Sequence, residues 1–122
     1  MGAWGDGPFE NDTALDYYSM LKDCNAEGIN AFLWMALDSK HEENVILATA
    51  IIGLIHNGKD DKLFFGADEQ CTEHIIKTAK KNDILKKEAL HKVKMLSLEH
   101  YCMWVDWKSR KEILKLLEEK LI

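Results

Sequence analysis

The sequence predicts an all-α protein, a compact bundle of five to six helices around a central apolar helix. Three observations support this fold class. The chain has one proline and seven glycines, which leaves long stretches free of helix breakers. Apolar residues recur at spacings of three and four, as on one face of a helix. Residues 45–55 are apolar except for Thr49 and Gly53, so a helix there needs cover on every side.

The length and composition predict one domain over residues 1–122. A chain of 122 residues divided in two would leave each half too small to bury a proper core. Its hydrophobic share of 47% and charged share of 30% are ordinary globular values, which argues against disorder.

Residues 1–10 are expected to form an irregular arm packed on the body of the domain. Pro8 and the glycines of this stretch break any helical period, whereas Trp4 and Phe9 are large apolar groups. A first helix is expected to begin within residues 11–13, which are good N-caps, and to end around Asp23. Phe9 precedes this start and can serve as a hydrophobic staple.

A second helix is predicted from the N-cap Asn25 to Asp38, with Trp34 and Met35 widening its apolar stripe. The central helix is predicted over about 44–57.

Ser39 and Glu42 have the S-x-x-E spacing of a capping box at the start of the central helix, and Gly58 is expected to end it in the left-handed conformation. A buried strand is the alternative for these β-branched residues. The capping box and the interior alanines favour a helix.

Three further helices complete the prediction. They are expected over 67–80, over 82–100, and from a second capping box at Ser109 and Glu112 to the end of the chain. The helical period falters at 104–107, which indicates a break there.

The uneven distribution of charge has two interpretations: simple solubility, which needs only a net charge away from zero and is the commoner reason, and attraction of a basic partner. Residues 1–61 carry three basic and eleven acidic side chains, an acidic balance that attracts basic proteins and repels nucleic acid. The lysines between 77 and 94 are interpreted as a solvated face, because Arg110 is the only arginine. We therefore expect no nucleic acid and, since no apolar run approaches the roughly 20 residues of a membrane helix, no membrane.

No residue pattern indicates a catalytic site, a metal site or a cofactor. Cys71 and His74 lie one helical turn apart, but the sequence has no paired C-x-x-C and no H-E-x-x-H. The cysteine number is odd and no secretory signal is recognisable, which predicts free thiols and a cytoplasmic protein.

The leading hypothesis is a non-catalytic protein-binding module, and specifically a cytoplasmic immunity protein. Such a protein neutralises a basic, nuclease-like toxin domain through an acidic surface with aromatic residues in it. The predicted contact residues are Asp38, Glu42, Glu43, Asp60, Asp61, Phe64 and Phe65. The adjacent Phe64 and Phe65 either tuck under their loop or form an exposed patch. We expect a monomer or a weak homodimer.

Two alternatives belong to other functional classes. One is a small hydrolase or metal-dependent enzyme that uses Asp12, Asp16, His41 or His74. The other is a self-associating structural protein.

The opening string MGAWGDGPFENDTALDY is the most specific motif in the chain. It resembles the start of a bacterial family, domain of unknown function 4259, whose members open Met-Gly-x-Trp-Gly, continue Pro-Phe-x-Asn-Asp, and then begin a helix with Ala-x-Asp. The matching positions are Gly2, Trp4, Gly5, Gly7, Pro8, Phe9, Asn11, Asp12, Ala14 and Asp16. Asp6 departs from the small or neutral residue expected there.

The resemblance implies a small, bacterial, cytoplasmic helical protein, and it brings no activity and no catalytic residues. Physical reasoning favours a structural role for the motif, with Trp4 and Phe9 as anchors and Asn11 or Asp12 as a helix cap. The alternative is a recognition site formed by Trp4, Asn11, Asp12 and Asp16.

Overall fold

The fold is built around one helix that lies between two layers of others. The computed structural model describes residues 8–9, 12–59, 63–64, 66–98 and 107–122. Within these ranges it contains helices and no strand, which confirms the all-α prediction. The helices are α1 (Asp12–Met20), the short 3-10 helix η1 (Leu21–Asp23), α2 (Ala26–Leu37), α3 (Glu42–Asn57), α4 (Glu69–Thr78), α5 (Asp83–Leu98) and α6 (Trp107–Leu121).

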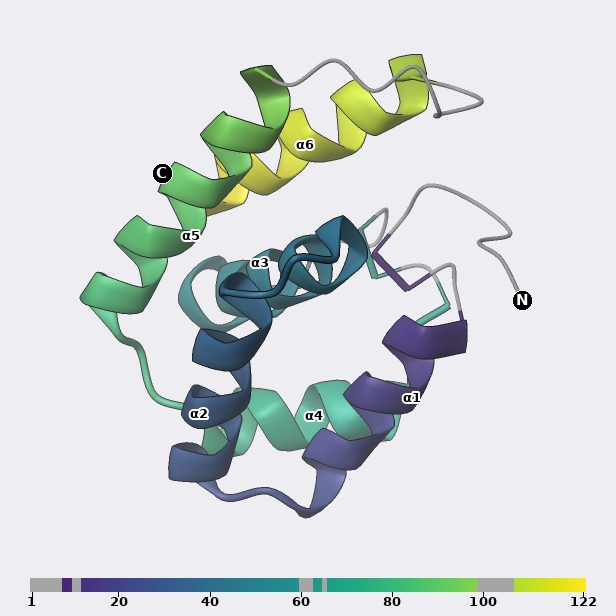
Figure 1. Ribbon diagram of the computed structural model, residues 1–122. Helices are drawn as coiled ribbons and strands as arrows, with labels where there is room; N and C mark the ends of the chain where they lie inside the picture. Colours follow the sequence, from purple (N-terminus) through teal and green to yellow (C-terminus); the bar gives the residue numbers. More distant parts are fainter. Residues whose placement is uncertain (1–7, 10–11, 60–62, 65, 99–106) are drawn as a thin grey trace.

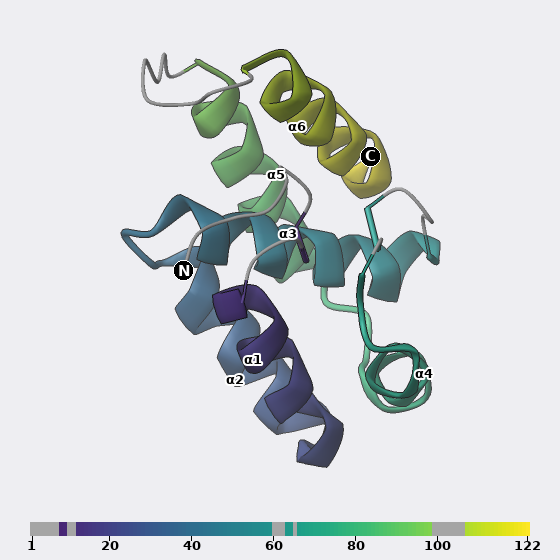
Figure 2. The same ribbon diagram turned by 90° about the vertical axis from the view of Figure 1, so that its right-hand side faces the viewer.

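The central position of α3 is clear in both views. The antiparallel pair α5 and α6 covers one side of it, and α1, α2 and α4 lie on the other side (Figures 1 and 2). The most extensive packing joins α3 to α6 and to α5, α5 to α6, and α2 to α3. Each covering helix therefore directs an apolar face toward α3.

The residues 45–54 of α3 are all buried, as the unbroken apolar run predicts. α6 approaches α3 closely at Gly53, because a Cβ placed on this residue would lie 3.0 Å from the Cβ of Lys120. The side chain of Lys120 donates to the carbonyl oxygen of Gly58 at 3.4 Å, and the Asn57 amide donates to the Lys120 carbonyl. A cation at the C-terminus of α3 also matches the negative end of its dipole.

The ends of the helices test the predicted caps. Asn25 caps α2, since its side chain accepts from the backbone N–H of Gly28 at 2.8 Å. The capping box at Ser39 is wrong: the N-cap of α3 is His41, two residues further along, and the Ser39 hydroxyl accepts from the His41 N–H at 3.1 Å. Gly58 ends α3 at φ 83° and ψ 177°, an extended conformation with positive φ, so the positive φ is as predicted but the left-handed α conformation is not.

The second predicted capping box is also wrong. The last helix begins at Trp107, so Ser109 lies inside it and is no N-cap. Spacings of three and four residues predict one apolar stripe on each of the two final helices. On α5 the stripe consists of Leu85, Ala89, Val93 and Leu96, of which the first three are buried and Leu96 is half-buried; on α6 it consists of Ile113, Leu117 and Leu121, all buried. The break predicted at 104–107 falls largely outside the described residues, which resume at Trp107.

An aromatic cluster joins the N-terminal arm to the body. Phe9 is fully buried, with its ring 4.7 Å from that of Tyr18 and 4.8 Å from that of Phe64. The buried Tyr18 hydroxyl lies 2.5 Å from the hydroxyl oxygen of Thr72 on α4. Because the Thr72 hydroxyl donates its proton to the carbonyl of Asp68, we infer that Tyr18 is the donor in the Tyr18–Thr72 hydrogen bond.

The start of α4 is fixed by Asp68, whose carboxylate accepts from the backbone N–H of Gln70 at 2.9 Å and of Cys71 at 3.3 Å. The Lys22 ammonium lies 2.9 Å from the same carboxylate and joins η1 to α4. The hydrogen bond from Lys22 lowers the pKa of Asp68, so the cap stays ionised at neutral pH.

Replacing Tyr18 with Phe is expected to lower the free energy of unfolding by about 1 kcal/mol, because it removes one buried hydrogen bond and leaves the packing intact. The matched control is Tyr17→Phe, whose side chain is 39% exposed and which should change stability by less than about 0.5 kcal/mol. Urea denaturation of both variants measures the difference. Equal effects of the two substitutions would contradict the assignment of a stabilising buried hydrogen bond to the Tyr18 hydroxyl.

Replacing Gly53 with Leu is expected to lower the free energy of unfolding by about 1–3 kcal/mol, because α3 and α6 must separate to admit the side chain. Hydrogen exchange followed residue by residue should show a larger loss of protection in α6 than in α2. An unchanged α6 would mean that the two helices do not meet at Gly53.

Candidate protein-binding site

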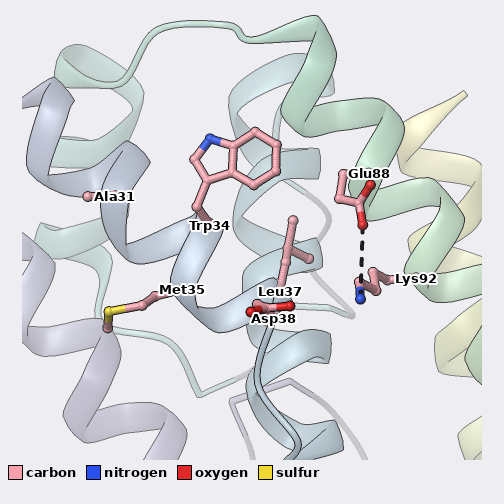
Figure 3. A pocket seen from close by; sticks show the side chains of 7 residues that line it. All are labelled: Ala31, Trp34, Met35, Leu37, Asp38, Glu88 and Lys92. Carbon is pink, nitrogen blue, oxygen red and sulfur yellow. Dashed lines mark ion pairs between the residues drawn. The ribbon is translucent and has the colours of Figure 1, made fainter.

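An open groove of about 540 Å³ lies between α2 and α5. Figure 3 shows it from close by, with side chains of both helices around it. Its lining residues are Ala31, Trp34, Met35, Leu37, Asp38, Glu88 and Lys92.

The helix α2 carries apolar side chains on its inner face and also on its outer face. The face that α2 turns inward buries Ile29, Leu33, Ala36 and Leu37 in the core.

Trp34 and Met35 lie away from that inner face and keep 38% and 72% of their surface exposed. The prediction that they widen the core stripe is therefore wrong. In Figure 3 the indole of Trp34 lies on the α5 side of α2, whereas Met35 points away from α5. An exposed tryptophan beside an exposed methionine is typical of a contact surface, since both residue types are enriched at protein interfaces.

The charges of the groove are unequally paired. The Lys92 ammonium lies 4.0 Å from the Glu88 carboxylate one turn away on α5, a weak surface ion pair. The Asp38 carboxylate has no hydrogen bond or ion pair with the part of the chain that the structure describes. Asp38 is therefore the carboxylate of the groove that is left for a partner.

The position of Asp38 is unfavourable for the helix that carries it. Asp38 is the C-cap of α2, where the helix dipole places partial negative charge. A carboxylate at this end destabilises a helix, whereas an external cation near it would relieve the repulsion. The stability of α2 therefore does not explain why an aspartate occupies this position.

Glu42 and Glu43 lie on the other side of the α2–α3 turn, in the first turn of α3. Acidic residues there complement the positive end of the helix dipole, so they have a structural role whether or not a partner binds. The fold thus places Asp38, Glu42 and Glu43 at one corner of the molecule, where α2 ends and α3 begins.

The other predicted contact residues are not part of this corner. Phe64 is only 5% exposed and packs against Phe9 and Tyr18, so its side chain cannot serve as a contact surface. Of the two predicted alternatives, Phe64 therefore follows the one in which the ring packs beneath its own loop, because a loop that returns to the body can place one aromatic ring in the core. Asp60, Asp61 and Phe65 lie outside the described residues.

The signature motif is partly visible in the structure. Pro8, Phe9 and Ala14 are buried, and α1 begins at Asp12. Asp16 is exposed on α1. The remaining signature positions, Gly2, Trp4, Gly5, Gly7 and Asn11, lie outside the described residues. For the residues that are visible, anchoring of the arm is the better supported role.

Two side chains that the sequence offered for metal binding or catalysis, those of Cys71 and His74, make structural contacts. The Cys71 thiol donates to the carbonyl of Tyr18 at 3.0 Å, and burial raises its pKa to about 11, so it is a poor nucleophile at neutral pH. His74 is hydrogen-bonded through Nε2 to the carbonyl of Cys24 at 2.7 Å.

No group of three or more His, Cys, Asp or Glu side chains gathers among the residues the structure describes. No described helix is long and apolar enough to cross a bilayer. The thiols of Cys24 and Cys71 are both free.

Comparison with known proteins places the chain in a family. No curated protein and no solved structure matches it. The model of one family, described as a domain of unknown function (DUF4259), matches residues 2–112. This match covers most of the 122 residues and includes α1 to α5, the groove and the start of α6. The chain therefore belongs to the family of the domain of unknown function DUF4259.

Proposed function

We propose that this chain is a non-catalytic protein-binding module that receives a basic protein in the groove between α2 and α5. The observation that carries the proposal is the Asp38 carboxylate, which has no partner among the described residues, beside the exposed side chains of Trp34 and Met35. A basic partner would place a cation at the C-terminus of α2 and would cover the apolar pair.

The composition of the groove agrees with this role. Binding energy at protein interfaces is concentrated in a few residues, among which tryptophan is enriched, with a polar rim around them. Trp34 supplies an apolar centre on the α5 side, Met35 extends the apolar surface on the outer side of α2, and Asp38 with Glu43 supplies an acidic edge. The acidic excess over residues 1–61 would accelerate encounter with a partner of opposite charge.

The narrower form of the proposal is a cytoplasmic immunity protein. Enzymes that attack nucleic acid carry basic surfaces because their substrate is anionic, and an inhibitor of such an enzyme gains from an acidic surface that contains aromatic residues. A toxin domain of the nuclease type is therefore the partner that we propose for the groove.

The test is calorimetric titration of the purified chain with the basic protein encoded beside it in its native genome. We expect Met35→Ser and Asp38→Lys each to weaken binding about tenfold or more, because they remove the apolar contact and reverse the charge. Affinity of the unmodified chain should also fall as salt is raised.

Two control variants carry the same chemical changes at distant surfaces. Ile76→Ser removes an apolar side chain that is 55% exposed on α4, and Glu119→Lys reverses an exposed charge on α6. Neither should change the affinity more than about twofold. Equal losses in all four variants, or no binding of the basic protein at all, would refute the proposal.

A further inference from the structure

A polar junction joins α2, α3 and α5 through one residue, Asn82. Its side-chain oxygen accepts from the backbone N–H groups of Ile84 and Leu85, both at 3.1 Å, and so caps the start of α5. Its side-chain amide donates to the Asn30 oxygen on α2 at 3.2 Å. Its backbone N–H donates to Nε2 of His56, in the last turn of α3, at 3.2 Å.

The contact between His56 and Asn82 requires a neutral imidazole. A ring nitrogen accepts a hydrogen bond only when it carries no proton, so the proton of His56 must be on Nδ1. A protonated His56 would present an N–H to the N–H of Asn82, and two donors repel each other. The hydrogen bond therefore exists in one protonation state only.

The surroundings of His56 disfavour its charged form. Burial has the largest effect and lowers its pKa, and Lys86 on α5 and Lys81 before it lower the pKa further. Asp83 and a backbone hydrogen bond with Asn82 act in the opposite direction, but the net effect is a lowered pKa. On the α6 side, the Lys120 ammonium reaches the carbonyl of Gly58 at the same end of α3. At neutral pH the imidazole of His56 therefore accepts the hydrogen bond from the Asn82 N–H, and the contact between α3 and the start of α5 is formed.

The junction borders the α2–α5 seam that also forms the candidate binding groove. A second hollow of about 630 Å³ opens on it, lined by Ala26, Glu27, Asn30, Lys80, Lys81, Asn82, Asp83 and Ile84. Asn30 and Asn82 thus lie near one end of the seam. Trp34, one helical turn after Asn30, and Glu88, six residues after Asn82, line the groove. Movement of the start of α5 would therefore alter the width of the groove.

We propose that His56 is a positioning residue for the groove, one that holds the start of α5 against α2 while its imidazole is neutral and releases it when protonated. The effect on the groove rests on the proposed function, whereas the movement of α5 does not. The consequence for binding is a groove that loses its shape in mildly acidic conditions.

The sign of the pH dependence follows from the lowered pKa. An unfolded chain protonates histidine near pH 6.5 and the folded chain does so at lower pH, so protons favour the unfolded form. The stabilisation from this contact is present above about pH 6.5 and is lost as the pH falls through the pKa of the folded state.

The experiment is an NMR titration of the full chain from pH 7.5 to 4.5, in the absence of any partner. The imidazole nitrogen signals of His56 report its protonation. Nuclear Overhauser contacts between the Asn30 and Asn82 side chains report the distance of α5 from α2. We expect these contacts to weaken about fivefold with the same midpoint as His56, while the α4 amides capped by Asp68 stay unchanged.

Two variants separate the proposal from a general loss of structure. His56→Gln keeps an acceptor that does not titrate, so the contacts between Asn30 and Asn82 should persist across the pH range. His56→Leu removes the acceptor, so the contacts should be weak at every pH. The proposal is overturned if the contacts persist when His56 is protonated, or if His56→Gln loses them with the same midpoint as the unmodified chain. Because no partner is present, failure of the proposed function would leave this result intact.

Discussion

The burial of residues 45–54 of α3 on every side is the constraint on which the rest of the structure depends. A helix that is apolar on every side is stable in water only when other elements surround it. The chain meets this requirement by folding α1, α2 and α4 on one side of α3 and α5 and α6 on the other. Gly53 lets α6 approach closely, and the hydrogen bond between Asn57 and Lys120 fixes the register of the two helices.

The candidate binding surface is a consequence of this arrangement. Because α2 uses one face to cover α3, its apolar residues on the other face remain at the surface, where Trp34 and Met35 have no core to enter. Asp38, at the end of the same helix, is repelled by the partial negative charge of the helix dipole, and no cation among the described residues offsets this repulsion. Folding stability explains neither the exposed apolar side chains nor this carboxylate, whereas binding of a partner would explain both. All three residues line the same groove.

The sequence predicts well what depends on local chemistry, such as the cap at Asn25, the central helix and the stripes of α5 and α6. Its errors arise where the outcome depends on distant residues. The S-x-x-E spacing at Ser39 and at Ser109 is compatible with a cap, but the chain enters each helix elsewhere. Periodicity could not show which apolar face of α2 is covered, nor that the groove includes Glu88 and Lys92, because these residues meet α2 only through tertiary packing.

The most direct test of the central role of α3 is native-state hydrogen exchange across a series of low denaturant concentrations. If α3 is stable only while the other helices surround it, the amides of residues 45–54 should exchange solely through global unfolding. Their exchange free energy would then equal the free energy of unfolding measured by denaturation. Exchange of these amides by a smaller opening, with α5 and α6 still protected, would contradict the account, because α3 would then not need its cover.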